Sequence, residues 1–339
     1  MKMPKSVSTI SATISWQSQL AQAITDPLQL LQILGIDPAL FPQCTQAHQS
    51  FQLKVPQCYL AKIQPGDPTD PLLIQVMANA IELAPAEGFT HDPVGDLNAV
   101  RTPGLLHKYT GRVLLITTSA CAIHCRYCFR RHFPYEAQQP ARQHWQAALN
   151  YIRTHPDITE VILSGGDPLS LSDQKLAELI AELDTIPHLK RLRIHSRIPV
   201  VLPARITQDF INVLAQSRLQ TCMVIHANHA HELGEPEQRV LAQLKQAGIL
   251  LLNQSVLLKD VNDSAATLVA LSERLYECGV LPYYLHLLDA VAGAQHFDIR
   301  EAEAVTIMND VRASLPGYLV PRLVRESAGE NSKTPVFGL

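Results

Sequence analysis

Short apolar runs rich in β-branched residues recur from residue 112 onward, separated mostly by segments with helical periodicity. The runs that predict strands are residues 112–118, 160–164, 191–196, 221–226, 249–255 and 283–288. The segments that predict helices are residues 144–154, 173–183, 207–215, 236–247, 265–278 and 300–313, and a last extended run covers 318–324. Most expected strands begin about 30 residues apart, which is the length of a βα unit. The pattern therefore predicts an α/β fold with six βα units.

The same pattern favours a parallel barrel, closed or open by about a quarter, over a doubly wound sheet. A Rossmann-like sheet is the alternative, but no G-x-G-x-x-G sequence opens the first expected helix. We place this (βα)6 TIM-like partial barrel at residues 104–317 and a C-terminal strand and segment at 318–339.

Residues 1–103 are expected to form a mainly helical extension. Ser15 is placed to cap an amphipathic helix that Pro27 divides, and a second helix is expected at residues 71–83. Residues 85–103 are typical of a loop. No catalytic constellation is visible here, so the expected role is packing against the barrel or against another subunit.

Composition narrows the class of protein. The 339 residues are 47% hydrophobic, as in ordinary globular proteins, and the net charge of -3 argues against general nucleic-acid binding. No apolar run reaches about 18 residues, so no membrane span is expected. The first fifteen residues lack the apolar core of a secretory signal, which together with reduced cysteines predicts a cytoplasmic protein.

Three of the seven cysteines lie within eight residues, at Cys121, Cys125 and Cys128, with the spacing C-x3-C-x2-C. Thiolates are the usual ligands of iron–sulfur clusters, and three of them hold three irons of a cubane while leaving the fourth open to a small molecule. This cluster loop (residues 121–128), with Tyr127 before the last cysteine, resembles that of S-adenosylmethionine (SAM) radical enzymes. The resemblance implies a 4Fe–4S cluster and SAM as cofactors.

Two other uses of these cysteines fit the sequence less well. A structural zinc site takes four protein ligands and His124 is available, but this chain lacks the second C-x2-C pair that zinc sites commonly have. A disulfide framework is typical of small secreted domains rather than of a long chain with unevenly spaced cysteines. The remaining cysteines are expected to be small apolar residues: Cys44, Cys58, Cys222 and Cys278.

Polar residues follow the expected strands at the same end each time. In strand order they are the cluster loop, residues 164–168, His195 with Arg197, His226, Gln254 and Asp289. Each alone is compatible with ordinary packing. Because active sites of parallel barrels lie at the C-terminal ends of the strands, their common placement predicts one shared site.

Two segments near this site have further chemical potential. Gly165 and Gly166 let the backbone approach a ligand closely; one unit after the cluster loop, they resemble the glycine motif that binds the SAM amino group. Residues 327–335 are small and flexible and include Lys333. Alone they are typical of an exposed tail. If they fold back over the barrel mouth, the lysine amine can form a Schiff base with pyridoxal 5′-phosphate (PLP).

Longer segments resemble the lysine 2,3-aminomutase family of radical SAM enzymes. They are the cluster loop with Arg130 and Arg131, and residues 195–203, 252–258 and 332–335. Segments 24–27, 103–109, 125–135 and 283–286 are similar to the branch that serves elongation factor P, so the resemblance covers nearly the whole chain.

The resemblance implies a role for individual residues. The ligands it implies for the cluster are Cys121, Cys125 and Cys128, and those for SAM are Ser164, Gly165, Gly166, Asp167, His226 and Gln254. Lys333 would hold PLP covalently, with its phosphate bound by Lys108, Tyr109 and Arg112. Arg130 would bind the substrate carboxylate, and Asp289 and Glu326 its ε-ammonium. Lys108 replaces an arginine of the free-lysine catabolic enzymes, so it offers a point charge without a bidentate fork, and Glu326 replaces an aspartate.

The implied reaction is conversion of (S)-α-lysine to (R)-β-lysine, which a separate ligase would attach to elongation factor P. The implied partners are free lysine and an electron donor such as flavodoxin or ferredoxin, with no nucleic acid and no membrane. The chain ends six residues after Lys333, without the zinc-binding, subunit-bridging tail of the catabolic enzymes, so a homo-oligomer is left open. Two alternatives remain: the same mechanism acting on glutamate or arginine, and a non-catalytic iron–sulfur or zinc protein.

Overall fold

The computed structural model describes residues 14–138 and 142–337. Its centre is one sheet of ten strands in sequence order, in which β3 to β9 are parallel neighbours and both ends are antiparallel. The strands are β1 Val100–Thr102, β2 Leu105–Tyr109, β3 Arg112–Thr118, β4 Glu160–Gly165, β5 Arg191–Ser196, β6 Gln220–Ile225, β7 Leu250–Val256, β8 Leu281–His286, β9 Arg322–Arg325 and β10 Thr334–Pro335. The sheet curves without closing, which confirms the open partial barrel.

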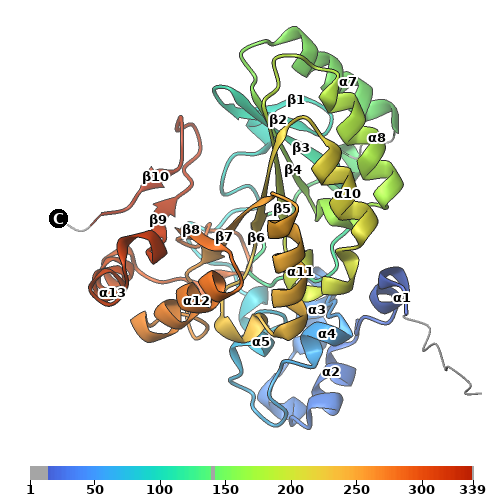
Figure 1. The fold of residues 1–339 in the computed structure, drawn as a ribbon. Helices are drawn as coiled ribbons and strands as arrows, with labels where there is room; N and C mark the ends of the chain where they lie inside the picture. The colour runs from blue at the N-terminus through green and yellow to red at the C-terminus, as the bar shows by residue number, and fades with distance from the viewer. Residues whose placement is uncertain (1–13, 139–141, 338–339) are drawn as a thin grey trace, which may run out of the picture.

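Helices on the outer face connect the parallel strands, as parallel pairing requires. They are α7 Arg142–Thr154, α8 Asp173–Asp184, α10 Gln208–Gln216, α11 Glu235–Gln246, α12 Ala265–Glu277 and α13 Glu301–Ser314 (Figure 1). The hydroxyls of Ser172, Thr207 and Ser264 accept a backbone N–H at the starts of α8, α10 and α12. All six helices, and the six strands they follow, agree with the predicted bounds within two residues.

Shorter helices complete the described chain. They are α1 Trp16–Ala21, α2 Pro27–Leu34, η1 Pro38–Leu40, α3 Cys44–Ser50, α4 Gln57–Leu60, α5 Pro71–Ile74, η2 Ala80–Leu83, η3 Leu97–Ala99, α6 Tyr135–Gln138, η4 Pro168–Ser170, α9 Ile198–Val201, η5 Pro203–Arg205, η6 Ala230–Glu232, η7 Gln295–Phe297 and η8 Gly317–Leu319. Ser15 caps α1, and Pro27 opens α2 rather than continuing α1, as predicted. None of the helices in the described ranges is long and apolar enough to span a membrane.

The helix predicted at residues 71–83 is wrong. It is two short helices, α5 and η2, because Asn79 starts the second with a capping box to Glu82. The carbonyl of Gln75, between them, accepts the N–H of Arg126 at 2.9 Å instead of continuing a helix. The break in this segment is therefore a contact surface for the cluster loop.

The loop predicted at residues 85–103 is also partly wrong. It contains η3 and β1, and β1 pairs with β2 in a hairpin at the edge of the sheet. These elements are too short to produce a periodic pattern in the sequence. The domain boundary expected at residue 103 falls within this hairpin and stays a prediction.

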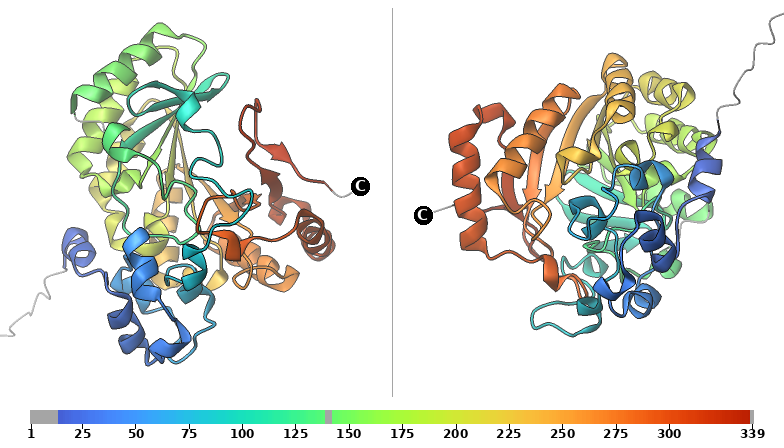
Figure 2. Two further views of the ribbon diagram at one scale, coloured as in Figure 1. Left: turned by 180° about the vertical axis from the view of Figure 1, so that it is seen from behind. Right: turned by 90° about the horizontal axis from the view of Figure 1, so that it is seen from below.

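The C-terminal segment folds back onto the sheet. The run expected at 318–324 is strand only from Arg322, since Pro321 cannot donate to a ladder. Antiparallel β10 then pairs with β9, with Thr334 opposite Arg325. The N-terminal helices lie across one end of the sheet, and the C-terminal segment forms its far edge (Figure 2).

Candidate active site

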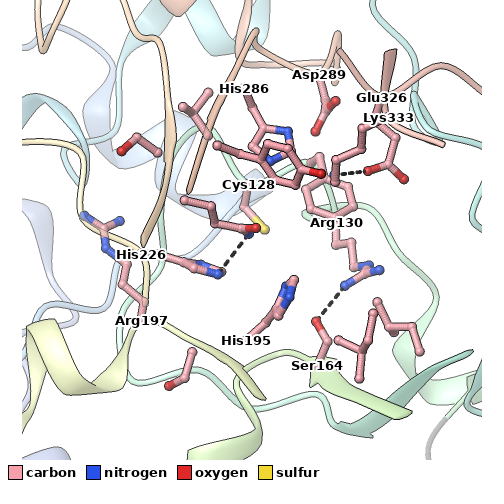
Figure 3. Close-up of a pocket in the computed structure, with 18 of the residues that line it drawn as sticks. Cys128, Arg130, Ser164, His195, Arg197, His226, His286, Asp289, Glu326 and Lys333 are labelled. Carbon is pink, nitrogen blue, oxygen red and sulfur yellow. Dashed lines mark hydrogen bonds and ion pairs between the residues drawn. The ribbon is translucent and has the colours of Figure 1, made fainter. Parts of the chain in front are cut away.

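A cavity of about 500 Å³ lies inside the curved sheet. Every residue that the sequence singled out for the cluster, SAM, PLP or substrate lines it, and Figure 3 shows several of them, among them Cys128, Arg130 and Lys333. The lining comes from Asp96 before η3, from β2 to β9, from the loops after β3, β4, β5, β6 and β8, and from the C-terminal segment. The fold thus gathers residues from 108 to 333 around one space.

The cluster loop carries its three thiols into this cavity as free cysteines. The N-terminal extension holds the loop through its backbone. The ammonium of Lys54 donates to the carbonyl of Cys121 at 2.9 Å, and the N–H of His124 donates to the carbonyl of Lys54 at 3.1 Å. The extension therefore shapes the cluster loop directly, a role that its sequence did not suggest.

His124 does not complete a zinc site with these cysteines. Its Nδ1 lies 2.9 Å from the carbonyl oxygen of Gln52, its ring stacks on Phe51 with centroids 5.5 Å apart, and it does not line the cavity. Within residues 14–138 and 142–337, no group of three His, Cys, Asp or Glu side chains is arranged around a single metal ion. A cubane, whose corners are separate irons, does not need such convergence.

Two arginines, Arg126 within the cluster loop and Arg131 just after it, are structural anchors. The carboxylate of Glu82 accepts from Arg126, including its Nε at 2.8 Å, and from Nη2 of Arg131 at 2.7 Å. Both arginines also lie over the ring of Phe51, and Arg131 reaches the carbonyl of Gly293. The two guanidinium groups stabilise the contact of this segment with the N-terminal extension and with the loop after β8, and neither lines the cavity.

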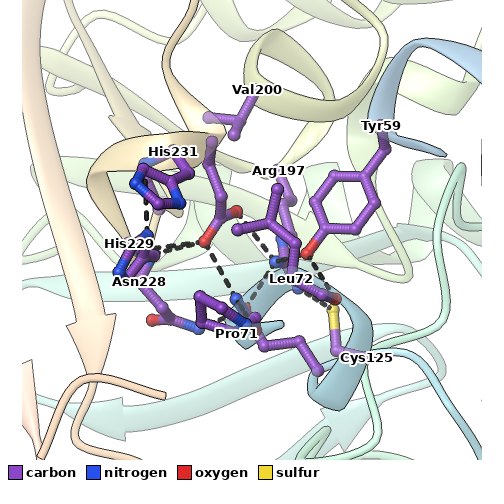
Figure 4. Close-up of polar contacts among 12 residues, drawn as sticks. Tyr59, Pro71, Leu72, Cys125, Arg197, Val200, Asn228, His229 and His231 are labelled. Atoms are coloured by element: carbon purple, nitrogen blue, oxygen red, sulfur yellow. Dashed lines mark hydrogen bonds and ion pairs between the residues drawn. The ribbon is translucent and has the colours of Figure 1, made fainter. Parts of the chain in front are cut away.

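Arg197, at the end of β5, supports the cluster loop from behind (Figure 4). Its Nη1 donates to Sγ of Cys125 at 2.7 Å and to the hydroxyl of Tyr127 at 2.6 Å. Its Nη2 donates to Gln75 at 2.7 Å and to fully buried Glu232 at 2.9 Å. A buried guanidinium is thus held by a carboxylate while it donates to a cluster-loop sulfur.

The turn at the end of β4 packs so closely against the backbone that follows β3 that two successive glycines are required. Gly165 has φ +123°, and a Cβ there would lie 2.7 Å from the carbonyl oxygen of Thr118. A Cβ on Gly166 would clash with the carbonyl of Ala120. The next residue, Asp167, lines the cavity, but its carboxylate accepts from the Ser196 hydroxyl and three backbone N–H groups. These contacts favour a role in fixing the turn.

Three histidines of the cavity wall are held neutral. Burial lowers the pKa of His226 to about 3, and Gln254 Nε2 lies 3.0 Å from its Nε2. Burial also lowers the pKa of His195 and of His286 well below the usual value. Nε2 of each of these two is buried and has no partner in the described part of the chain, so each can still bond a ligand.

A chain of alternating charges connects the C-terminal segment with the cluster loop. Nζ of Lys333 lies 2.6 Å from Oε2 of Glu326, whose Oε1 lies 3.0 Å from Nζ of Lys108. Asp96 then accepts from Lys108 at 2.6 Å and from Nε of Arg130 at 2.7 Å. The two lysines hold the pKa of Glu326 well below its usual value against the opposing effect of burial.

The residues proposed to bind the two ends of the substrate, Arg130 and Asp289, differ in their hydrogen-bond partners. Nη1 of Arg130 donates to the Ser164 hydroxyl at 3.2 Å, which leaves the outer guanidinium N–H groups facing the cavity. The Asp289 carboxylate has no hydrogen bond from a described residue. Burial, and next the charge of Glu326, raise the pKa of Asp289 to about 7. Arg130 comes from the segment after β3 and Asp289 from the segment after β8, so the two groups reach the cavity from different strands of the sheet.

Two further arginines line the cavity: Arg112 at the start of β3 and Arg322 at the start of β9. The guanidinium of Arg112 lies over the ring of Tyr109 at 4.7 Å and has no ion pair with any described residue. Arg322, at the start of β9, lines the cavity together with Val324 on the same strand, since residues two apart in a strand point the same way. These groups could take a phosphate.

Sequence reasoning missed several residues of the site. Asp96 lies in a segment that resembles an ordinary loop, and neither spacing nor composition marks it. His286 and Arg322 line the cavity at alternate positions of their strands. Counting every second residue along each predicted strand would therefore have identified them. Gln75 and Glu232 support Arg197 from segments far apart in the chain, and only the fold brings them together.

Known proteins match both the cluster segment and the whole chain. The profile of the Radical SAM superfamily matches residues 115–268. The chain is 50% identical over 320 residues to L-lysine 2,3-aminomutase of Haemophilus influenzae, across 94% of this chain and 95% of that protein. It is 49% identical over 322 residues to L-lysine 2,3-aminomutase of Escherichia coli, across 95% and 94%. It is 35% identical to that of Clostridium subterminale, across 95% of this chain and 77% of that protein. The chain therefore belongs to the lysine 2,3-aminomutase family of radical SAM enzymes.

Proposed function

We propose that this chain is an isomerase that converts (S)-α-lysine to (R)-β-lysine with a 4Fe–4S cluster, SAM and PLP. One observation carries the proposal: a single cavity is lined by the three free cluster-loop cysteines, the amine of Lys333, the guanidinium of Arg130 and the carboxyl of Asp289. Each cofactor and each end of lysine thus has a matching group in the same space.

The residues fit the cluster and SAM. Three thiols on one loop that line a common cavity suit a cubane with one open iron. Gly165 and Gly166 line the cavity beside Ser164, and without side chains they let a ligand approach their backbone groups. His226 and Gln254 supply neutral polar groups from the next strands. Asp167 fixes the turn rather than contacting SAM with its carboxylate.

The residues also fit PLP, but Lys108 has a different role from the one expected. Lys333 extends into the cavity and provides the amine. The ammonium of Lys108 has three donors, and Val94, Asp96 and Glu326 accept all three at 2.9, 2.6 and 3.0 Å. The phosphate therefore falls to Arg112 and Tyr109, while Lys108 holds the surrounding segments together.

When bound, these cofactors supply a 5′-deoxyadenosyl radical that takes a hydrogen from the substrate β-carbon, and a conjugated ring that delocalises spin while the amino group migrates. The chain supplies position. Arg130 directs its outer N–H groups at the substrate carboxylate, with Nε fixed by Asp96. Arg197 donates to Sγ of Cys125, and hydrogen bonds to cluster sulfurs adjust the potential of the cluster.

Two carboxyl groups hold the far end of lysine. The Asp289 carboxylate lines the cavity and accepts no hydrogen bond from a described residue, so it is the first acceptor for the ε-ammonium. Glu326 is paired with Lys333, and it can accept the ammonium once that lysine is engaged with the cofactor. An ammonium without such a partner would cost several kcal/mol to desolvate, at roughly the scale known for buried ions.

The wider setting belongs to the same proposal. The β-lysine would supply a separate ligase that modifies elongation factor P, and flavodoxin or ferredoxin would reduce the cluster in the cytoplasm. This part is supported by segments 103–109 and 125–135, which resemble the branch that serves elongation factor P.

Lysine turnover should depend on the ionisation of Asp289. Its pKa is raised to about 7, so its neutral form, which cannot pair with an ammonium, predominates below that pH. We expect kcat/KM for β-lysine formation to fall about tenfold per pH unit below 7. Asp289→Asn should flatten this limb and lower kcat/KM by about two to three orders of magnitude.

The measurement is β-lysine formed anaerobically by the reduced, SAM- and PLP-loaded enzyme on either side of pH 7. SAM cleavage without lysine, measured at each pH, controls for effects on the cluster. Unimpaired lysine turnover by Asp289→Asn would contradict the proposed function.

A further inference from the structure

Asp96 is a buried carboxylate in the loop before η3, with 2% of its surface exposed. Asp92 fixes this loop by accepting the N–H of Asp96 at 2.8 Å and that of Leu97 at 3.1 Å. The side chain of Asp96 is therefore not used as a cap. It points into the cavity wall, where both of its oxygens are occupied by cations.

The two oxygens of Asp96 have separate tasks. Oδ2 accepts from Nε of Arg130 at 2.7 Å, which fixes the rotation of the guanidinium and leaves its outer edge to the Ser164 hydroxyl and the cavity. Oδ1 lies 2.6 Å from Nζ of Lys108. Arg130 and Lys108 together hold the pKa of Asp96 below its usual value, although burial opposes them.

Lys108 connects Asp96 to the other edge of the sheet through a second ion pair, with Glu326. It stands on β2, and its ammonium reaches Glu326, directly after β9, at 3.0 Å. Since β2 and β9 are near opposite ends of the sheet order, this ion pair crosses the opening of the barrel. Glu326 then holds Lys333 at 2.6 Å. Gly95, beside Asp96, packs closely against Ala328 of the same C-terminal segment.

We infer that Asp96 is a positioning residue for both ends of the active site, orienting Arg130 toward the substrate carboxylate and placing Lys333 for PLP through Lys108 and Glu326. Asp96 touches neither substrate nor cofactor in this arrangement. The region before residue 103, which resembles a packing extension, thereby contributes to substrate and cofactor affinity. This inference rests on the proposed function for its substrate arm only.

The test compares Asp96→Asn with wild type and with a matched control. Asn keeps the size of the side chain but removes its charge, so one cation loses an acceptor. The control is Glu237→Gln, which removes another buried acid, 2% exposed and ion-paired with Lys62 at 2.9 Å, that does not line the cavity. Asp96→Glu keeps the charge and serves as the second variant if Asp96→Asn does not fold.

Four quantities are measured on the cluster-loaded protein: PLP affinity by absorbance titration, KM for lysine, kcat for lysine, and SAM cleavage without lysine. We expect Asp96→Asn to weaken PLP affinity and to raise the KM for lysine, each by about ten- to a hundredfold, as loss of a supporting partner does. The kcat should change much less, because ground state and transition state lose the same contact. SAM cleavage should be unchanged, and Asp96→Glu should recover part of both affinities.

Two results would overturn the inference. One is PLP affinity and KM within about twofold of wild type in Asp96→Asn, a change too small for a supporting partner. The other is equal losses in Glu237→Gln, which would show a general effect of removing a buried acid. Failure of the proposed function is a separate result, in which wild-type enzyme forms no β-lysine, while the PLP titration still decides the role of Asp96.

Discussion

Replacing Cys121, Cys125 or Cys128 with alanine should abolish both the bound cluster and SAM cleavage. Two thiolates cannot secure a cubane whose fourth iron must stay open, and the four other cysteines, Cys44, Cys58, Cys222 and Cys278, do not line the cavity. Iron per chain should fall from about four to near zero after anaerobic reconstitution. Iron and sulfide analysis, together with 5′-deoxyadenosine formed after reduction, measures the effect.

Cys222→Ala is the matched control for this series. Cys222 is also a free cysteine, but it lies on β6 and does not line the cavity. It should keep the full iron content and the full rate of SAM cleavage. Loss of the cluster in Cys222→Ala, or its retention in Cys125→Ala, would overturn the ligand assignment.

Lys333→Ala should abolish β-lysine formation and remove the absorbance of lysine-bound PLP, while the cluster and its SAM cleavage remain. The reason is that only PLP needs an amine, and the cluster ligands lie on a separate loop. Borohydride reduction of the wild type, followed by peptide mapping, should locate the label on Lys333. Lys259 is an exposed lysine outside the cavity, and a label there instead would contradict the assignment.

The parallel strands and the ligands at their ends could be predicted because both are local in sequence. Arg112–Thr118 and Arg191–Ser196 are strands with the predicted bounds, and a strand period places polar residues after each at the same end. The chain then only has to curve for these residues to meet. Family resemblance added Lys333, which no periodicity marks, and β10 places it at the cavity.

The features that the sequence did not predict depend on contacts between segments far apart in the chain. Asp96 meets Arg130 and Lys108 only because the β1–β2 hairpin lies beside the cluster loop. The break between α5 and η2 depends on the backbone of Gln75 bonding Arg126, a partner that helical periodicity cannot reveal. Local propensity predicts individual helices and strands, whereas the contacts of these residues depend on how the helices and strands pack against one another.

Two alternatives to lysine isomerisation make different demands on the cavity. Glutamate would bring a second carboxylate toward Asp289 and Glu326, and like charges at such a distance repel. Arginine has a cationic end that both acids would accept, but it is longer and needs more room. A non-catalytic iron–sulfur protein would have no need for Arg130, Asp289 and Lys333 in one cavity.

The most direct test offers the enzyme equal amounts of lysine, arginine and glutamate and quantifies the β-amino acids formed. The enzyme is reduced anaerobically and loaded with SAM and PLP, and the products are resolved by chiral chromatography. The account predicts that (R)-β-lysine is the dominant product and that Asp289→Asn forms little of it. A dominant β-glutamate or β-arginine product, or SAM cleavage with no β-amino acid, would contradict the account.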